Sequence, residues 1–125
     1  MTKLAAILIG LIALLHIYIA WFGIFQWETQ GPIAFPDLPR DLFEPTRAMA
    51  ANQGVYNALL AAGLIWTLCI KNALWQKRIA TCFLLFVAAA GILGGYRVSP
   101  DVAIAQAGPA VIALLLLWLP VLRRD

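Results

Sequence analysis

The chain has 125 residues, of which 63% are hydrophobic and only 12% are charged. Soluble domains carry roughly 25% charged residues, so this composition excludes an ordinary soluble domain and indicates a membrane protein. The length suits a single membrane domain, residues 1–125, without a soluble module. A net charge of +3 without a basic stripe argues against a nucleic-acid partner. Cys69 and Cys82 have neither metal-binding nor Cys-x-x-Cys spacing, so we expect no metal and no cofactor.

Four apolar stretches predict an all-α fold, a bundle of four transmembrane helices. A spanning helix needs about 20 mostly apolar residues, and the stretches are residues 4–27, 48–70, 79–98 and 102–122. The first is too long for a signal-peptide core and lacks an Ala-x-Ala cleavage site. The segment 28–47 is rich in proline, which disfavours a long helix, and we predict a loop there. Ser99-Pro100-Asp101 predicts the start of the last helix, with Ser99 as its cap.

The distribution of basic residues predicts the orientation. If both termini are cytoplasmic, the cytoplasmic side holds the larger set: Lys3, Lys71, Lys77, Arg78, Arg123 and Arg124. The opposite side then holds only Arg40, Arg47 and Arg97. The positive-inside rule favours this arrangement, with the loop 28–47 outside the cytoplasm.

Small residues recur at helical spacing in two of the predicted spans. Gly54, Ala58 and Ala62 are four residues apart, and the third span contains Gly91 and Gly94. Such faces let helices approach closely in lipid. Packing within one bundle is the favoured interpretation, and a homo-oligomer formed through these faces is the alternative.

The most unusual stretch is polar and begins an apolar segment: Asn52-Gln53-Gly54-Val55-Tyr56-Asn57. The residues that follow are almost wholly hydrophobic, so we expect these polar groups to enter the outer half of the bilayer. Polar side chains in hydrocarbon are costly and usually face a bundle interior at a working site. The sequence therefore predicts a ligand-binding pocket at one depth, formed by His16, Asn52, Gln53, Tyr56, Asn57, Arg97 and Gln106.

Structural explanations compete with a pocket at each of these positions. A lone His in a membrane is more often a packing residue than a metal ligand. The amides can simply join helices, with about 0.6–2 kcal/mol per hydrogen bond, and Arg97 can be a snorkelling cation at the interface. In favour of the pocket, Ala20 and Gly23 are small and lie above His16 on its helix, which leaves room for a partner or a ligand beneath a lid formed by Trp27.

The segments His16-Ile17-Tyr18 and 51–64, together with Gln106 and Pro109, resemble a bacterial and fungal family of small membrane proteins, the domain of unknown function 1304 family. The resemblance covers nearly the whole chain. It implies a four-span protein, and we expect it in the bacterial cytoplasmic (inner) membrane, with membrane lipid as a partner. The family pattern places an acidic residue seven positions after the His, where this chain has Gly23.

A looser similarity is to the four-span membrane proteins of eicosanoid and glutathione metabolism. Those proteins have Arg, Ala and Asn near the start of the second helix, and Arg47, Ala51 and Asn52 are similar to that pattern. Their acidic residue three positions after the Asn is Val55 here.

Three functions stay open. The first is binding of a small amphipathic or lipid-like molecule. The second is a membrane enzyme, with His16 as acid–base and Tyr56 as proton donor. The third is a small proton-coupled transporter, which we rank last because the predicted spans contain no carboxylate.

Overall fold

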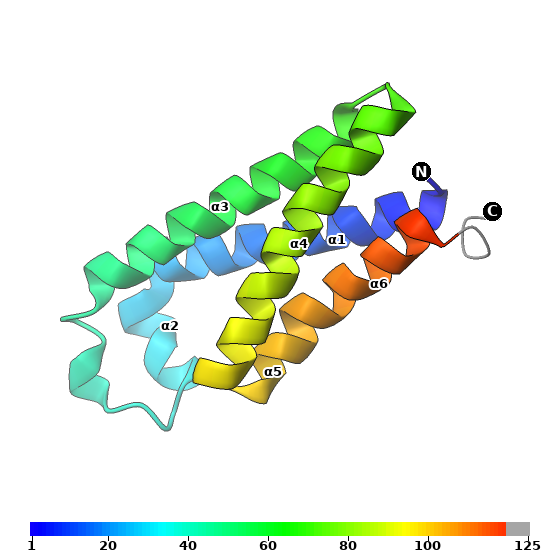
Figure 1. Cartoon of the computed structure of the whole chain (residues 1–125). Helices are drawn as coiled ribbons and strands as arrows, with labels where there is room; N and C mark the ends of the chain where they lie inside the picture. The colour runs from blue at the N-terminus through cyan, green and yellow to red at the C-terminus, as the bar shows by residue number, and fades with distance from the viewer. Residues whose placement is uncertain (120–125) are drawn as a thin grey trace. The chain divides into compact units, whose positions relative to one another are not determined.

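The computed structural model describes residues 1–119, whose regular structure is entirely helical, and the predicted all-α class is confirmed. The first helix is continuous through three segments, α1 (Lys3–Trp21), the π-helical η1 (Phe22–Gln26) and α2 (Trp27–Ala34). A loop with the short turn η2 (Arg40–Leu42) leads to α3 (Arg47–Cys69) and α4 (Ala73–Arg97). The last helix consists of α5 (Pro100–Val102), the π-helical η3 (Ala103–Ala107) and α6 (Gly108–Trp118) (Figure 1).

These helices form two compact units. One contains residues 14–61, and the other contains residues 1–13 with the chain from Ala62 onward. The unit of residues 14–61 holds the end of α1, all of α2 and the first part of α3. The other unit holds the start of α1, the end of α3, and the pair formed by α4 and the last helix.

Three helices within residues 1–119 are long and apolar enough to cross a membrane: Lys3–Ala34, Ala73–Arg97 and Pro100–Trp118. The helix α3 is not among them, although it has 23 residues. Its first half carries the amides and the phenol of the Asn52–Asn57 stretch, which lower its mean hydropathy. A fourth span along α3 therefore stays a prediction.

The first helix does not end at residue 27, as the sequence predicts, but continues through Pro32 to Ala34. An aromatic cluster, with ring centroids 5.0–6.3 Å apart, surrounds this extension: Phe22, Trp27, Phe35 and Phe43. Gly31 lies directly against the cluster, where an added Cβ would meet the Phe43 ring at 2.6 Å. Tertiary packing thus stabilises helical turns that the proline content of this segment argues against.

Two other helix starts follow from their caps. The helix α4 begins at Ala73 rather than at residue 79, because the Asn72 side chain accepts a hydrogen bond from the Trp75 N–H at 3.0 Å. The predicted cap of the last helix is confirmed, since Ser99 Oγ accepts from the Asp101 N–H at 3.3 Å. The end of the fourth predicted span, residues 120–122, and the basic pair Arg123 and Arg124 lie outside the described residues.

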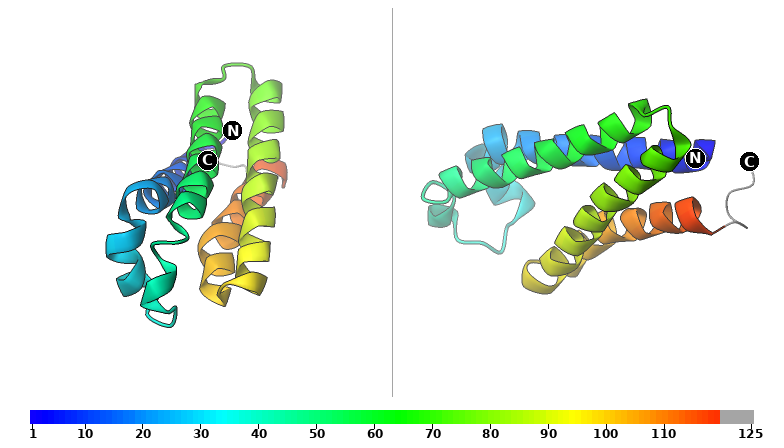
Figure 2. Two further views of the ribbon diagram at one scale, coloured as in Figure 1. Left: turned by 90° about the vertical axis from the view of Figure 1, so that its left-hand side faces the viewer. Right: turned by 45° about the horizontal axis from the view of Figure 1, so that its top comes forward.

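Within the unit that contains them, α4 and the last helix lie side by side (Figures 1 and 2). A Cβ added to Gly91 would meet the backbone nitrogen of Ala107 at 2.6 Å, and one added to Gly94 would meet the side chain of Val102. Backbones can approach this closely only where side chains are minimal. The glycines of α4 are therefore used for packing inside this unit.

Candidate functional site

In the unit of residues 14–61, α1 with η1 runs antiparallel to α3 and touches it backbone to backbone. A Cβ added to Gly54 would meet the carbonyl oxygen of Ala20 at 2.9 Å, and one added to Gly23 would meet that of Ala50 at 2.7 Å. The small residues Ala20 and Gly23 therefore make room for a packing partner, the helix α3, and not for a ligand. The same contact leaves no room at position 23 for the acidic residue of the family pattern.

His16 lies one helical turn before Ala20 and is fully buried, with 0% of its surface exposed. Since Ala20 lies beside Gly54 in an antiparallel pair, His16 lies beside the turn of α3 that follows Gly54. That turn presents Asn57 and Ala61 on the same face as Gly54, at spacings of three and four residues. The structure thus directs His16 and Asn57, two of the predicted site residues, toward one helix–helix interface.

Asn57 is half-buried, and its Nδ2 donates a hydrogen bond to the backbone oxygen of Gln53 at 2.9 Å. This bond lies within α3 and satisfies the amide locally, which is one of the structural roles that compete with ligand binding. At the interface, the Asn57 Nδ2 is therefore already hydrogen-bonded to the backbone of its own helix.

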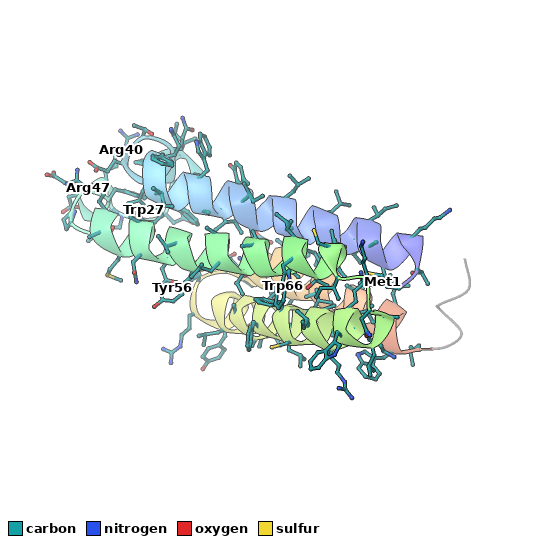
Figure 3. The ribbon with its side chains drawn as sticks, turned by 90° about the horizontal axis from the view of Figure 1, so that it is seen from above. Met1, Trp27, Arg40, Arg47, Tyr56 and Trp66 are labelled. Carbon is teal, nitrogen blue, oxygen red and sulfur yellow. The ribbon has the colours of Figure 1, made fainter. Side chains whose placement is uncertain are left out.

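Asn52, Gln53 and Tyr56 are exposed, Tyr56 with 57% of its surface. Figure 3 shows Tyr56 partway along α3. Asn52 and Tyr56 lie on the same face of α3 as Gly63 and Thr67. Along the chain these four residues are separated by four, seven and four positions in turn, and each of these separations is close to a whole number of helical turns. We call these four residues the Tyr56 face of α3. Asn52 and Tyr56 form its exposed half.

The other half of the Tyr56 face is packed. A Cβ added to Gly63 would overlap the ring of Phe83 on α4. Thr67 is fully buried, and its Oγ1 donates to the Gly63 carbonyl at 2.9 Å. Gln76 Nε2 donates to the Thr67 carbonyl at 3.2 Å, which ties the start of α4 to the end of α3.

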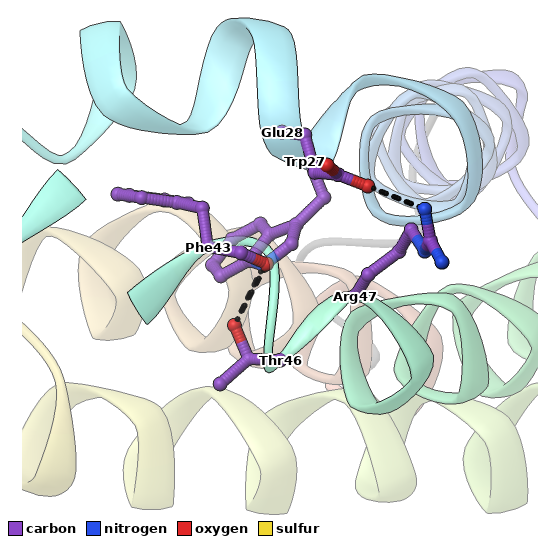
Figure 4. A network of polar contacts seen from close by, with 5 residues as sticks. All are labelled: Trp27, Glu28, Phe43, Thr46 and Arg47. Carbon is purple, nitrogen blue, oxygen red and sulfur yellow. Dashed lines mark hydrogen bonds and ion pairs between the residues drawn. The ribbon is translucent and has the colours of Figure 1, made fainter. Parts of the chain in front are cut away.

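At the start of α3, polar contacts join it to α2 (Figure 4). The Trp27 Nε1–H donates to Thr46 Oγ1 at 2.9 Å, and Thr46 Oγ1 donates to the Leu42 carbonyl at 2.6 Å. Arg47 forms an ion pair with Glu28 at 3.0 Å. Trp27 is therefore a packed member of the aromatic cluster rather than a lid, and Arg47 is engaged by a carboxylate of its own chain. This pairing gives no support to the glutathione-type similarity.

The remaining predicted site residues belong to the other unit. Gln106 lies in η3 and is half-buried, and its Cβ faces Gly91 across the close contact between η3 and α4. Arg97 is exposed at the end of α4, with its guanidinium carbon 5.6 Å from the centroid of the Tyr96 ring. Their participation in a pocket with the residues of α3 stays a prediction. Within residues 1–119, no three His, Cys, Asp or Glu side chains gather as metal ligands would.

Sequence reasoning missed the two π-helical segments, η1 and η3. Each contains a glutamine, Gln26 or Gln106, and each lies in a helix of membrane length. Such segments disturb the regular helical hydrogen bonds and are frequent at functional sites. Hydropathy and periodicity carry no signal for them. A glycine does mark a close backbone approach at each one: Gly23 lies within η1, and Gly91 of α4 packs against η3.

The described fold defines an all-α chain with three helices long and apolar enough to cross a membrane. The chain belongs to the family described as Protein of unknown function (DUF1304), whose family model matches residues 10–118, and the resemblance predicted from the His16 and Asn52–Asn57 segments is confirmed. It is similar to the uncharacterized protein YpaA of Lactococcus lactis subsp. lactis (strain IL1403). The two are 26% identical over 117 residues, which cover 92% of this chain and 97% of that protein. No solved structure matches.

Proposed function

We propose that the protein is a four-span integral membrane protein that binds a small amphipathic or lipid-like molecule on the exposed half of the Tyr56 face. In this proposal α3 is the additional span, and both termini lie on the cytoplasmic side of a bacterial inner membrane. The observation that supports it is the exposure of Asn52, Gln53 and Tyr56 in a chain whose other long helices are apolar enough for lipid. In hydrocarbon, polar groups without partners cost several kcal/mol, so they need hydrogen-bonding partners.

An amphipathic ligand fits the chemistry of this surface. The amides of Asn52 and Gln53 both donate and accept hydrogen bonds, and the Tyr56 phenol does the same. One turn further along α3, Leu59 is exposed over 60% of its surface and offers an apolar contact. A molecule with a polar head and an apolar tail, aligned with the helix, would satisfy the amides and cover the leucine at once.

Two of the other predicted site residues take supporting roles in this proposal. His16 and Asn57, at the interface of α1 with α3, would position the helix that carries the ligand, and Arg97 and Gln106, in the other unit, are not part of the proposed site. Binding is favoured over the enzyme because a general acid–base must come within hydrogen-bond reach of its substrate. His16 is fully buried, which suits a positioning role better than direct proton transfer to a ligand.

Native mass spectrometry of protein purified from its own membrane tests the binding proposal. We expect a copurifying small molecule on the wild type and its loss from an Asn52→Leu/Tyr56→Phe variant. Gln30→Leu is a matched control, because Gln30 is an exposed amide on α2. Equal retention by all three proteins, or no bound molecule on the wild type, would contradict the proposal.

Thiol labelling tests whether α3 spans the membrane. Single cysteines replace Asp37, in the loop before α3, and Lys71, after its end, in a chain whose Cys69 and Cys82 are changed to serine. An impermeant reagent applied to intact cells should label the cysteine at position 37 and not the one at position 71. Labelling of both, or of neither, would mean that the two ends of α3 lie on the same side of the membrane.

A further inference from the structure

A group of cations lies where α3 connects to α4, and we call Lys71, Lys77 and Arg78 the basic patch. The sequence contains no Asp or Glu between Glu44 and Asp101, so neither α3 nor α4 supplies a carboxylate to it. The ion pair found within residues 1–119 joins Arg47 to Glu28, in the other unit. The basic patch therefore carries a concentrated positive charge without a neighbouring acidic side chain on its own two helices.

Two of these cations lie over tryptophan rings. The Lys77 Nζ lies 3.7 Å from the centroid of the Trp118 ring, and the guanidinium carbon of Arg78 lies 5.6 Å from that of Trp75. Trp118 is itself oriented by a hydrogen bond from its Nε1–H to Thr81 Oγ1 at 2.9 Å. Exposed tryptophans at the ends of membrane-length helices are typical of the headgroup level of a bilayer. The aromatic rings therefore place the charges at the depth of lipid phosphates.

The backbone at this connection is also held in place and electrostatically positive. Asn72 caps α4, and the hydrogen bond from Gln76 to the Thr67 carbonyl fixes the first turn of α4 against a buried part of α3. The first turn of α4, a helix of 25 residues, contains no acidic residue. Its N-terminal dipole therefore adds to the positive potential of the side chains.

We propose that the basic patch binds the phosphate of an anionic phospholipid such as phosphatidylglycerol. A lipid fits better than a soluble phosphate because Leu74 and Trp75, directly between the cations in sequence, are exposed and would contact acyl chains. The inference rests on the proposed membrane embedding but not on the ligand of the Tyr56 face, whose polar residues lie at the opposite end of α3.

The test is a native mass spectrometry titration of delipidated protein in a neutral detergent. Phosphatidylglycerol should bind more tightly than phosphatidylcholine, and soluble glycerol phosphate should bind weakly. Lys71→Gln, Lys77→Gln and Arg78→Gln should each weaken phosphatidylglycerol binding about fivefold, the effect expected for one cation near an anionic surface. Arg40→Gln, which removes an exposed cation in the other unit, should leave binding unchanged.

Equal binding of the two lipids, or equal effects of Arg40→Gln and the patch variants, would overturn the proposal. Tight binding of glycerol phosphate would overturn the choice of a lipid as the ligand. Circular dichroism checks the fold, and Lys77→Arg, which keeps the charge over Trp118, should restore binding that Lys77→Gln loses. The Asn52→Leu/Tyr56→Phe variant should retain phosphatidylglycerol, so failure at the Tyr56 face and failure at the basic patch give different results.

Discussion

The two halves of the Tyr56 face lie on one helix and have opposite surroundings. Gly63 and Thr67 are buried, the first against Phe83 and the second with its hydroxyl bonded to the helix backbone. Asn52 and Tyr56, on the same face two or more turns earlier, are exposed. The buried half carries small or internally bonded groups, and the exposed half carries an amide and a phenol. A helix face therefore does not have one role along its whole length.

The largest effect is expected at the packed half, with Gly63→Val. The added side chain overlaps the Phe83 ring, so the ring must leave its position. We expect the free energy of unfolding to fall by about 2–3 kcal/mol, as is typical of overpacking. Ala62→Val is the control, because Ala62 is exposed on the same helix. Denaturant titration in detergent measures both, and equal losses would show that the packed half is not tightly packed.

A pair of hydroxyl deletions compares the two halves directly. Thr67→Val removes a buried hydrogen bond and should lower the free energy of unfolding by about 1 kcal/mol. Tyr56→Phe should change it by less than about 0.5 kcal/mol, as is usual at an exposed position. Tyr56→Phe should instead reduce retention of the copurifying ligand. A large stability loss in Tyr56→Phe with unchanged ligand retention would reverse the assignment of the two halves.

The anchor at the start of the exposed half is the hydrogen bond between Trp27 and Thr46. A double-mutant cycle with Trp27→Phe and Thr46→Val isolates it, and the expected coupling is about 0.5–1.5 kcal/mol. Phe retains most of the ring packing of the aromatic cluster, so the cycle reports mainly the hydrogen bond. A coupling near zero would mean that ring packing alone joins α2 to α3.

The smallest effect is expected for Arg47→Gln. Its ion pair with Glu28 is exposed at both side chains, and such pairs contribute less than about 1 kcal/mol. We expect little change in thermal unfolding and none in ligand retention. A clear loss of ligand, with stability unchanged, would instead mean that Arg47 takes part in ligand binding.

The sequence alone predicted the helical class, the family, the approximate positions of the long helices and the cap at Ser99. The helices and the cap depend on mean hydropathy and on local hydrogen bonding, which a short window of residues determines. The family follows from the His16 and Asn52–Asn57 segments. It also singled out the Asn52–Asn57 stretch as polar within an apolar context. It did not predict the continuation of the first helix through Pro32, because the contact that stabilises it comes from Phe43, in a later segment.

Tertiary structure alone decided which way each polar group points. The sequence grouped Asn52, Gln53, Tyr56 and Asn57 into one pocket, but the backbone contact of Gly54 with Ala20 shows that the side of α3 that carries Gly54 is the one that faces α1. That contact turns Asn57 toward the interface that buries His16 and leaves Tyr56 exposed. The physical reason is that a helix has the same periodicity whatever its rotation about its axis, and the rotation is set by the neighbours it packs against.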